Sequence, residues 1–199
     1  MYPFIDSLCL RDGEYELLRL HLQRISATCK KHFQVERNLN PILESLDQEA
    51  GDKSGLWKLT LRYDEHHHQI QSVAYSPRSL KRLHLIEDPA IDYAYKYADR
   101  SAFDFHLKNL EPEEDILITQ HGLLTDASYA NVILWDGEAW FTPSTPLLNG
   151  VKRQYLLSKK QIIEREIRIE DIPNYFMISL INAMLNPGDV MLSTENIVP

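Results

Sequence analysis

The sequence predicts an α+β fold, because strand patterns and helix patterns occur in both halves of its 199 residues. Two observations support this prediction. Apolar residues between positions 18 and 33 recur every three or four residues, which is helix spacing. Those between positions 57 and 63 alternate with polar residues, which is strand spacing. A chain of this length accommodates one ordinary domain or two small ones.

The first half is predicted to contain two strand regions and two helices before a final strand. In order, the expected elements are a strand 4–10, a helix to about 33, a helix from 42 to about 48, a hairpin from 57 into the early seventies and a strand 83–86. Asp12-Gly13 favours a turn, and Asn40-Pro41 supplies an N-cap and a first helical residue. The histidines 66–68 fall at the hairpin tip, where consecutive side chains do not converge on one ion, so no metal site is predicted.

Glu87-Asp88-Pro89 breaks the strand pattern, and we place a domain boundary there. Residues 1–88 are expected to form a smaller N-terminal α/β domain, and residues 89–199 a larger C-terminal domain. The second domain is expected to contain, in order, a helix after 96, strands at 116–118, 131–135 and 139–142, a helix 150–157, a strand 162–169, a helix from Pro173 and a last apolar segment 189–192.

Composition excludes several classes of protein. The 21 Lys and Arg against 29 Asp and Glu give a net charge of -8, which argues against a nucleic-acid partner. Two cysteines are too few for a disulfide framework, and neither a signal peptide nor an apolar stretch of membrane-spanning length is present. We therefore expect a soluble cytoplasmic protein with no membrane partner.

Five sequence blocks carry chemically suggestive residues. They are LHLQR at 20–24, YKYADR at 95–100, GLLTDASYAN at 122–131, TP at 142–143 with PLLNGVKR at 146–153, and LINAM at 180–184. In this order the blocks resemble the aminotransferase class IV family of pyridoxal-phosphate enzymes, also called fold type IV. The resemblance spans about residues 4–184. It implies a two-domain D-amino-acid-aminotransferase-like fold with mixed sheets and flanking helices, a pyridoxal 5'-phosphate site between the domains, and a homodimer.

By this resemblance Lys96 is the catalytic Schiff-base lysine, and Asp126 is the carboxylate that keeps the cofactor's ring nitrogen protonated. Asn131 supports the site from the following strand. Many family members carry Glu at the position of Asp126. Considered without the other blocks, Lys96 is better explained as a surface lysine lying over Tyr95 and Tyr97, and the alternative for Asp126 is a turn residue.

The phosphate is expected to bind at two places. Arg24 corresponds to the family's phosphate arginine, although an arginine on a helix is otherwise a solvent-facing residue. The backbone at Val151 and Lys152 opens a predicted helix, and helix N-termini bind anions. The family often has Thr in place of Lys152. The resemblance also places the backbone turn at Asn182-Ala183 beside the cofactor.

The segment 182–185, Asn-Ala-Met-Leu, resembles the corresponding segment of 4-amino-4-deoxychorismate lyases. The resemblance therefore implies a lyase that forms p-aminobenzoate and pyruvate in folate biosynthesis from a small-molecule amine. Two alternatives stay open, an aminotransferase acting on D- or branched-chain amino acids and a catalytically silent pyridoxal-phosphate-binding protein. The chain lacks the extra N-terminal strand and the glycine-rich loop of full-length members, which normally shape the substrate pocket.

Overall fold

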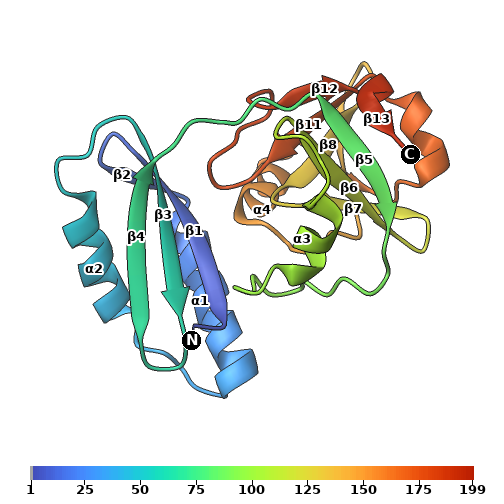
Figure 1. The fold of residues 1–199 in the computed structure, drawn as a ribbon. Helices are drawn as coiled ribbons and strands as arrows, with labels where there is room; N and C mark the ends of the chain where they lie inside the picture. The colour runs from blue at the N-terminus through green and yellow to red at the C-terminus, as the bar shows by residue number, and fades with distance from the viewer. Residues whose placement is uncertain (1) are drawn as a thin grey trace. The chain divides into compact units, whose positions relative to one another are not determined.

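The computed structural model describes residues 2–199 and contains two compact units, which are described separately (Figure 1). The N-terminal unit extends to Ser76 and also includes Tyr95–Asp99. The C-terminal unit comprises Pro77–Ala94 and Arg100–Pro199. The boundary that we predicted after residue 88 lies inside the C-terminal unit, because the strand preceding it pairs with a strand of that unit. The segment around Lys96 therefore belongs to the unit that contains the N-terminus.

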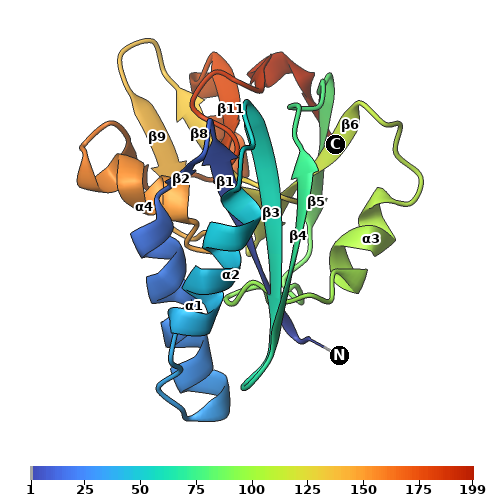
Figure 2. The same cartoon turned by 90° about the vertical axis from the view of Figure 1, so that its left-hand side faces the viewer.

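The N-terminal unit is an antiparallel sheet in the order β2-β1-β3-β4, packed against two helices (Figures 1 and 2). Its elements are β1 Phe4–Arg11, β2 Glu14–Glu16, α1 Leu18–Phe33, α2 Asn40–Ala50, β3 Leu56–Tyr63 and β4 His68–Ala74. Asp12 and Gly13 have φ values of 49° and 84°, which is the left-handed conformation that the Asp-Gly pair permits in the β1–β2 turn. The strand, the two helices and the hairpin that were predicted up to β4 are confirmed.

The core of this unit explains its sequence pattern. Alternate residues of β1 point to the same face, so Phe4, Leu8 and Leu10 are buried against apolar residues of the helices, such as Ile25 in α1 and Leu46 in α2. Helix α1 contributes one apolar stripe at a spacing of three to four residues, as predicted. Removing this face from water is the main source of the unit's stability.

The segment Tyr95–Asp99 runs along β1. The Ile5 N–H donates to the Lys96 carbonyl at 2.9 Å, and the Ala98 N–H donates to the Pro3 carbonyl at 2.8 Å. The Tyr97 ring lies 5.5 Å from the ring of Phe4. The start of β1 therefore fixes the backbone position of Lys96.

The C-terminal unit is built on a nine-stranded sheet in the order β10-β9-β8-β7-β6-β5-β13, with β11 pairing with β8 and with β12. The strands are β5 Arg82–Glu87, β6 Glu114–Gln120, β7 Leu123–Ala127, β8 Asn131–Trp135, β9 Trp140–Pro143, β10 Ile163–Arg165, β11 Met177–Ile181, β12 Met191–Ser193 and β13 Ile197–Val198. The helices are α3 Ser101–Leu107 and α4 Val151–Ser158, with 3-10 turns at Ile169–Asn174 and Thr194–Asn196. Parallel and antiparallel pairs both occur, which confirms the mixed α+β class.

The predicted helix from Pro173 is wrong. Pro173 lies inside a 3-10 turn that ends at Asn174, and β11 follows. Strand β11 pairs with both β8 and β12, and four of its five residues are buried. Its residues are apolar except for Ser179, and the buried and exposed positions do not alternate, so its sequence does not distinguish it from a buried helix. The predicted strand 162–169 is also shorter than expected, since β10 ends at Arg165.

Within residues 2–199, no helix combines the length and the apolar character that crossing a bilayer requires.

Candidate active site

Asp126 lies on β7 and is buried, with a relative exposure of 5%. Its Oδ1 accepts a hydrogen bond from the Asn131 side-chain amide at 2.7 Å, and its Oδ2 accepts one from the Leu148 N–H at 3.0 Å. Burial raises the pKa of Asp126 from 3.8 to about 6, because these neutral donors and the more distant charge of Arg153 offset only part of the desolvation. A cation brought against this carboxylate would favour its ionised form.

Asn131 connects Asp126 to the loop before α4. The Nδ2 group of Asn131 also donates to the Leu148 carbonyl at 2.7 Å. Gly150 is required beside it, because a Cβ atom there would lie 2.1 Å from Asn131 Oδ1. The pairing of Ile181 with Asn131 brings the end of β11 to the same place. Asn131 therefore fixes both the carboxylate and the start of α4.

Helix α4 begins at Val151 with Gly150 as an extended N-cap that supplies no side-chain hydrogen bond to the helix. The first N–H groups of a helix have no carbonyl partner within it, so they present a partial positive charge to an anion. The side chain of Lys152 is buried, and its Nζ donates to Asn186 Oδ1 at 2.8 Å. The backbone of Val151 and Lys152 thus retains the predicted position at a helix N-terminus, while the Lys152 side chain extends to the segment after β11.

The turn at Asn182 directly follows β11. Asn182 Oδ1 accepts hydrogen bonds from the N–H groups of Met184 at 2.8 Å and Leu185 at 3.1 Å. Its Nδ2 donates to the Tyr129 carbonyl at 3.3 Å, and Ala183 is buried. The Asn182 side chain thus closes the predicted turn and joins it to the loop between β7 and β8.

Arg100 supports the same loop from the start of α3. Its Nη2 donates to the Ser128 carbonyl at 2.8 Å, and its guanidinium lies 4.7 Å from the Phe103 ring centroid and 5.8 Å from that of Tyr93. Ser128 comes two residues after Asp126 in the chain. Arg100 therefore holds the backbone that follows the buried carboxylate.

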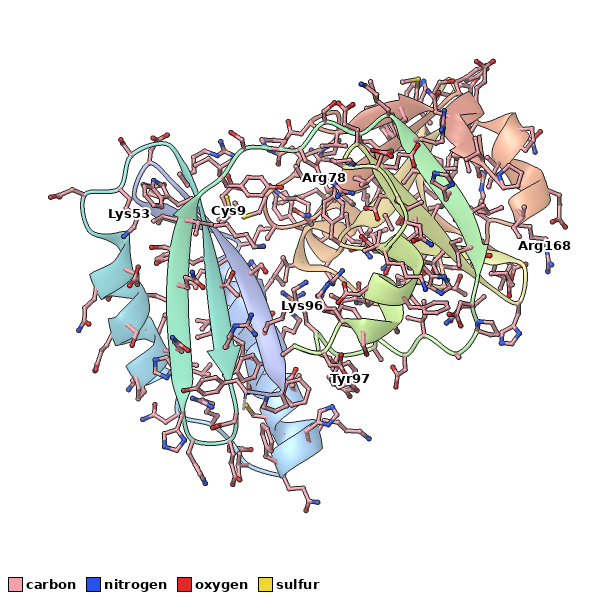
Figure 3. The ribbon with its side chains drawn as sticks, viewed as in Figure 1. Cys9, Lys53, Arg78, Lys96, Tyr97 and Arg168 are labelled. Carbon is pink, nitrogen blue, oxygen red and sulfur yellow. The ribbon has the colours of Figure 1, made fainter. Side chains whose placement is uncertain are left out.

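Lys96 is half-buried in the N-terminal unit, and Figure 3 marks it together with Tyr97. Its two tyrosine neighbours belong to an aromatic cluster in which the Tyr95 ring lies 4.4 Å from the ring of His32 and the Tyr97 ring lies 5.5 Å from that of Phe4. These contacts fix the residues on either side of the lysine. Lys96 is thus attached to a well-packed part of the unit. A lysine that holds a group in one orientation requires such support.

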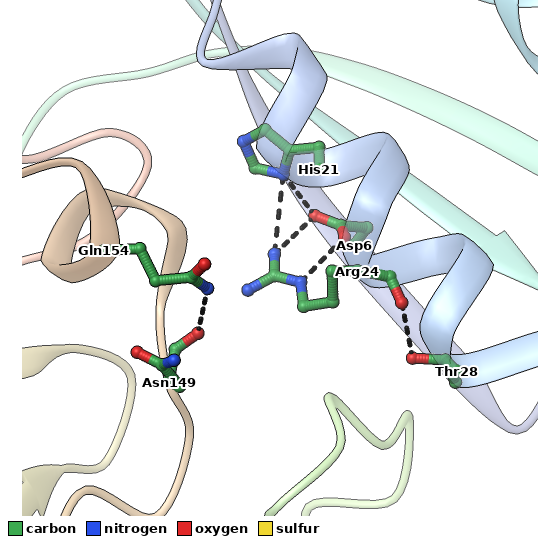
Figure 4. A network of polar contacts seen from close by, with 6 residues as sticks. All are labelled: Asp6, His21, Arg24, Thr28, Asn149 and Gln154. Carbon is green, nitrogen blue, oxygen red and sulfur yellow. Dashed lines mark hydrogen bonds and ion pairs between the residues drawn. The ribbon is translucent and has the colours of Figure 1, made fainter. Parts of the chain in front are cut away.

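Arg24 lies on α1 and is bound by a carboxylate that sequence analysis did not single out (Figure 4). Arg24 Nε donates to Asp6 Oδ2 at 3.0 Å, and Nη2 donates to Asp6 Oδ1 at 2.7 Å. Nδ1 of His21 lies 2.7 Å from the same Oδ1. Burial acts to raise the pKa of Asp6, but the charges of Arg24 and His21 and their hydrogen bonds hold it below its ordinary value.

The structure brings the predicted residues together in two groups. In the C-terminal unit, the hydrogen bonds of the Asp126, Asn131, Lys152 and Asn182 side chains connect β7, the start of α4 and the turn after β11. In the N-terminal unit, Lys96 and Arg24 are both attached to β1, through Ile5 and Asp6. Sequence analysis missed Asp6 and Asn186. A signal for Asp6 existed, because a lone acid occupies an inward position between the apolar residues Phe4 and Leu8.

Comparisons with known proteins identify the family. The family model described as amino-transferase class IV matches residues 4–187, which is most of the chain. The chain belongs to the class IV aminotransferase family. Pyridoxal phosphate is the cofactor of this family, as the sequence blocks implied. Both the family and the fold class that we predicted are confirmed.

Several relatives in the family cover nearly the whole chain. A Haemophilus influenzae protein described as uncharacterized is 30% identical over 185 residues, which are 92% of this chain and 98% of that protein. A Haemophilus somnus structure, of a protein proposed to be a 4-amino-4-deoxychorismate lyase, has 30% identity and a TM-score of 0.83, covering 92% of this chain and 97% of its own. The pyridoxal-phosphate-bound form of a hypothetical Mycobacterium tuberculosis aminotransferase, at 16% identity and a TM-score of 0.76, covers 98% of this chain and 81% of its own and shares the fold.

The described residues fit the family's cofactor. Pyridoxal phosphate presents an aldehyde, a basic ring nitrogen and a phosphate, and each has a matching group in this chain. Lys96 has a primary amine, Asp126 is a buried carboxylate with neutral donors, and the Arg24 guanidinium and the N-terminus of α4 are each groups that can bind an anion. The close approach of Gly150 to Asn131 keeps that helix N-terminus clear of a side chain. Residues 2–199 contain no cluster of three or more His, Cys, Asp or Glu side chains that could hold a metal ion.

Proposed function

We propose that this class IV enzyme is a pyridoxal-phosphate-dependent 4-amino-4-deoxychorismate lyase, which forms p-aminobenzoate and pyruvate. The observation that carries the proposal is the similarity to the Haemophilus somnus protein, itself proposed to be such a lyase, over 92% of this chain and 97% of that one. The Asn182 turn, whose sequence resembles that of the lyases, is additional support.

Each proposed residue has one task. Pyridoxal phosphate, when bound, supplies an electron sink for the bond-breaking steps. Lys96 holds the cofactor and is the base. Asp126 keeps the proton on the ring nitrogen, and Asn131 holds Asp126 in place. Arg24 and the backbone N–H groups of Val151 and Lys152 bind the phosphate.

The reaction balances without water or an oxidant. Lys96 Nζ takes a proton from the ring carbon that bears the amine, and a proton is returned to the methylene carbon of the enolpyruvyl group. The bond between the ring carbon and the enolpyruvyl oxygen breaks, and pyruvate leaves. The six-membered ring becomes aromatic, which makes the reaction strongly downhill.

The decisive test is an assay with enzymatically generated 4-amino-4-deoxychorismate. We expect pyruvate and p-aminobenzoate to appear in equal amounts, while the visible absorption band of the bound cofactor persists through many turnovers. An amino acid without a keto acid should leave that band unchanged. Stoichiometric pyridoxamine phosphate from a D- or branched-chain amino acid, with no pyruvate from the chorismate derivative, would replace the lyase by an aminotransferase. A cofactor band with no turnover of any amine would indicate a silent binding protein.

Lys96→Ala tests the assignment of the lysine. We expect the variant to fold, to lose the visible band and to lose at least about a hundredfold in turnover, since proton transfer by a positioned group commonly contributes that much. The matched control is Lys159→Ala, an exposed lysine at the end of α4, which should behave as wild type. If borohydride still attaches the cofactor covalently to the Lys96 variant, the assignment is wrong and Lys152 is the next lysine to test.

A further inference from the structure

Asp6 occupies a position where a charge is costly. It lies on the inward face of β1, between the buried residues Phe4 and Leu8, and none of its surface is exposed. An ionised carboxylate buried in this way requires several kcal/mol of compensation from partners. An apolar residue would complete the face of the strand, so packing alone does not account for an acid at this position.

The partners of Asp6 lie on one face of α1. His21 and Arg24 are three residues apart, which places their side chains together on a helix. Both carboxylate oxygens bind the guanidinium, through Nε and Nη2, and the His21 ring shares Oδ1 with Nη2 (Figure 4). Thr28 Oγ1 donates to the Arg24 carbonyl at 2.9 Å. The other ring nitrogen of His21, Nε2, is buried without a hydrogen-bond partner among residues 2–199, so Asp6 is what orients the ring.

This geometry sets the direction of Arg24. A guanidinium held at Nε and one terminal nitrogen cannot rotate within its plane, so the position of Nη1 is fixed relative to β1. The neighbouring residue of β1, Ile5, binds the Lys96 carbonyl. Ile5 and Asp6, which are consecutive in β1, thus position both the proposed cofactor lysine and the proposed phosphate ligand relative to the same strand.

We propose that Asp6 is the positioning residue for the cofactor phosphate, holding Arg24 in the orientation that a phosphate oxygen needs. The inference depends on the proposed use of pyridoxal phosphate by this chain. It competes with a different effect of the same contact, because a carboxylate beside Arg24 also neutralises part of its charge. The two effects predict opposite outcomes. Loss of the carboxylate weakens phosphate binding if positioning dominates and strengthens it if neutralisation dominates.

The test compares two ligands of the full-length cofactor-free protein. Pyridoxal phosphate and pyridoxal differ only in the phosphate, so the ratio of their affinities isolates the phosphate contacts. For Asp6→Asn we expect the affinity for pyridoxal phosphate to fall about tenfold or more, the size of a charge-assisted hydrogen bond, with the affinity for pyridoxal unchanged. Arg24→Ala should lower the affinity for pyridoxal phosphate by at least as much. When Asp6→Asn is added to Arg24→Ala, the ratio of the two affinities should not change further. Asp47→Asn, an exposed acid of α2, is the matched control and should leave the ratio unchanged.

Other outcomes overturn the inference. An unchanged or increased ratio in folded Asp6→Asn removes the positioning role while leaving the proposed cofactor intact. If Asp6→Asn does not fold, Arg24→Lys decides the matter, because a lysine keeps the charge but cannot be held as a fork by Asp6. We expect Arg24→Lys to lower the ratio of the affinities for pyridoxal phosphate and pyridoxal nearly as far as Arg24→Ala does. A ratio equal to that of wild type would contradict the proposal. A wild-type protein that binds neither ligand would overturn the proposed function as well, so the two failures are distinguishable.

Discussion

Asp6 of the N-terminal unit and Asp126 of the C-terminal unit, two of the three aspartates buried within residues 2–199, have opposite protonation behaviour. Asp6 and Asp126 are both almost fully withdrawn from water, and both accept hydrogen bonds at both oxygens. The pKa of Asp6 lies below its ordinary value, whereas burial raises that of Asp126 to about 6. Burial penalises the charge in both cases, so burial alone does not explain the difference.

The charge of the partners explains it. Asp6 faces a guanidinium and an imidazole, and the Coulomb attraction of these groups together with their hydrogen bonds outweighs the desolvation. Asp126 is bound by a side-chain amide and a backbone N–H, which carry no net charge. The comparison suggests two roles. Asp6 is already paired inside the protein, whereas among residues 2–199 no cation lies at hydrogen-bond distance from Asp126, and a protonated ring nitrogen would supply one.

The largest expected effect is on stability. Asp6→Ala leaves Arg24 and His21 without their carboxylate, and breaking a buried pair in this way typically costs about 3–5 kcal/mol. Urea unfolding at pH 7 measures this loss. Because the folded-state pKa of Asp6 is depressed, its contribution is present above its ordinary pKa of 3.8 and is lost as the pH falls below that value. Combining the change with Arg24→Met should cost less than the sum of the single changes, and strict additivity would show that the two residues are not coupled.

The contribution of Asp126 to stability should depend on pH in the opposite direction from that of Asp6. Its folded-state pKa is raised, so the folded cofactor-free protein binds more protons than the unfolded chain between about pH 4 and 6. Asp126 therefore lowers the free energy of unfolding as the pH rises through this range. Each unit by which its pKa is raised corresponds to about 1.4 kcal/mol, so the total loss is on the order of 3 kcal/mol. Unfolding of wild type and Asp126→Asn at pH 4.5 and 7 measures this difference. The variant should gain relative to wild type at the higher pH, and a parallel pH dependence would contradict the raised pKa.

The smallest effect concerns Asn131. Asn131→Ala removes one of the hydrogen bonds that lower the pKa of Asp126, so that pKa should rise further above 6. The change also leaves the Leu148 carbonyl without its donor, and losing a buried hydrogen bond costs about 1–3 kcal/mol. A carbon-detected NMR titration of the Asp126 carboxyl group measures the shift. A lower pKa in the variant would mean that Asn131 does not stabilise the ionised carboxylate.

Local sequence pattern was sufficient for most of the elements. The apolar spacing of α1, the alternation in β3 and the Asp-Gly turn after β1 each depend on residues close together in the chain, and each was predicted correctly. Strand β11 was not, because its neighbours β8 and β12 are what make it a strand. Its apolar run contains no periodicity from which to choose between helix and strand.

The sequence by itself determined the family and the cofactor, since the order of the blocks along the chain does not depend on their position in space, and it predicted the site residues. Only the tertiary structure decided what each side chain contacts. In the folded chain Arg24 binds Asp6, the buried Lys152 side chain donates to Asn186, and the partners of Asp126 are neutral. The physical reason is that a carboxylate's protonation and an arginine's direction depend on groups within a few ångströms, and Asp6 and Arg24 are 18 positions apart in the sequence.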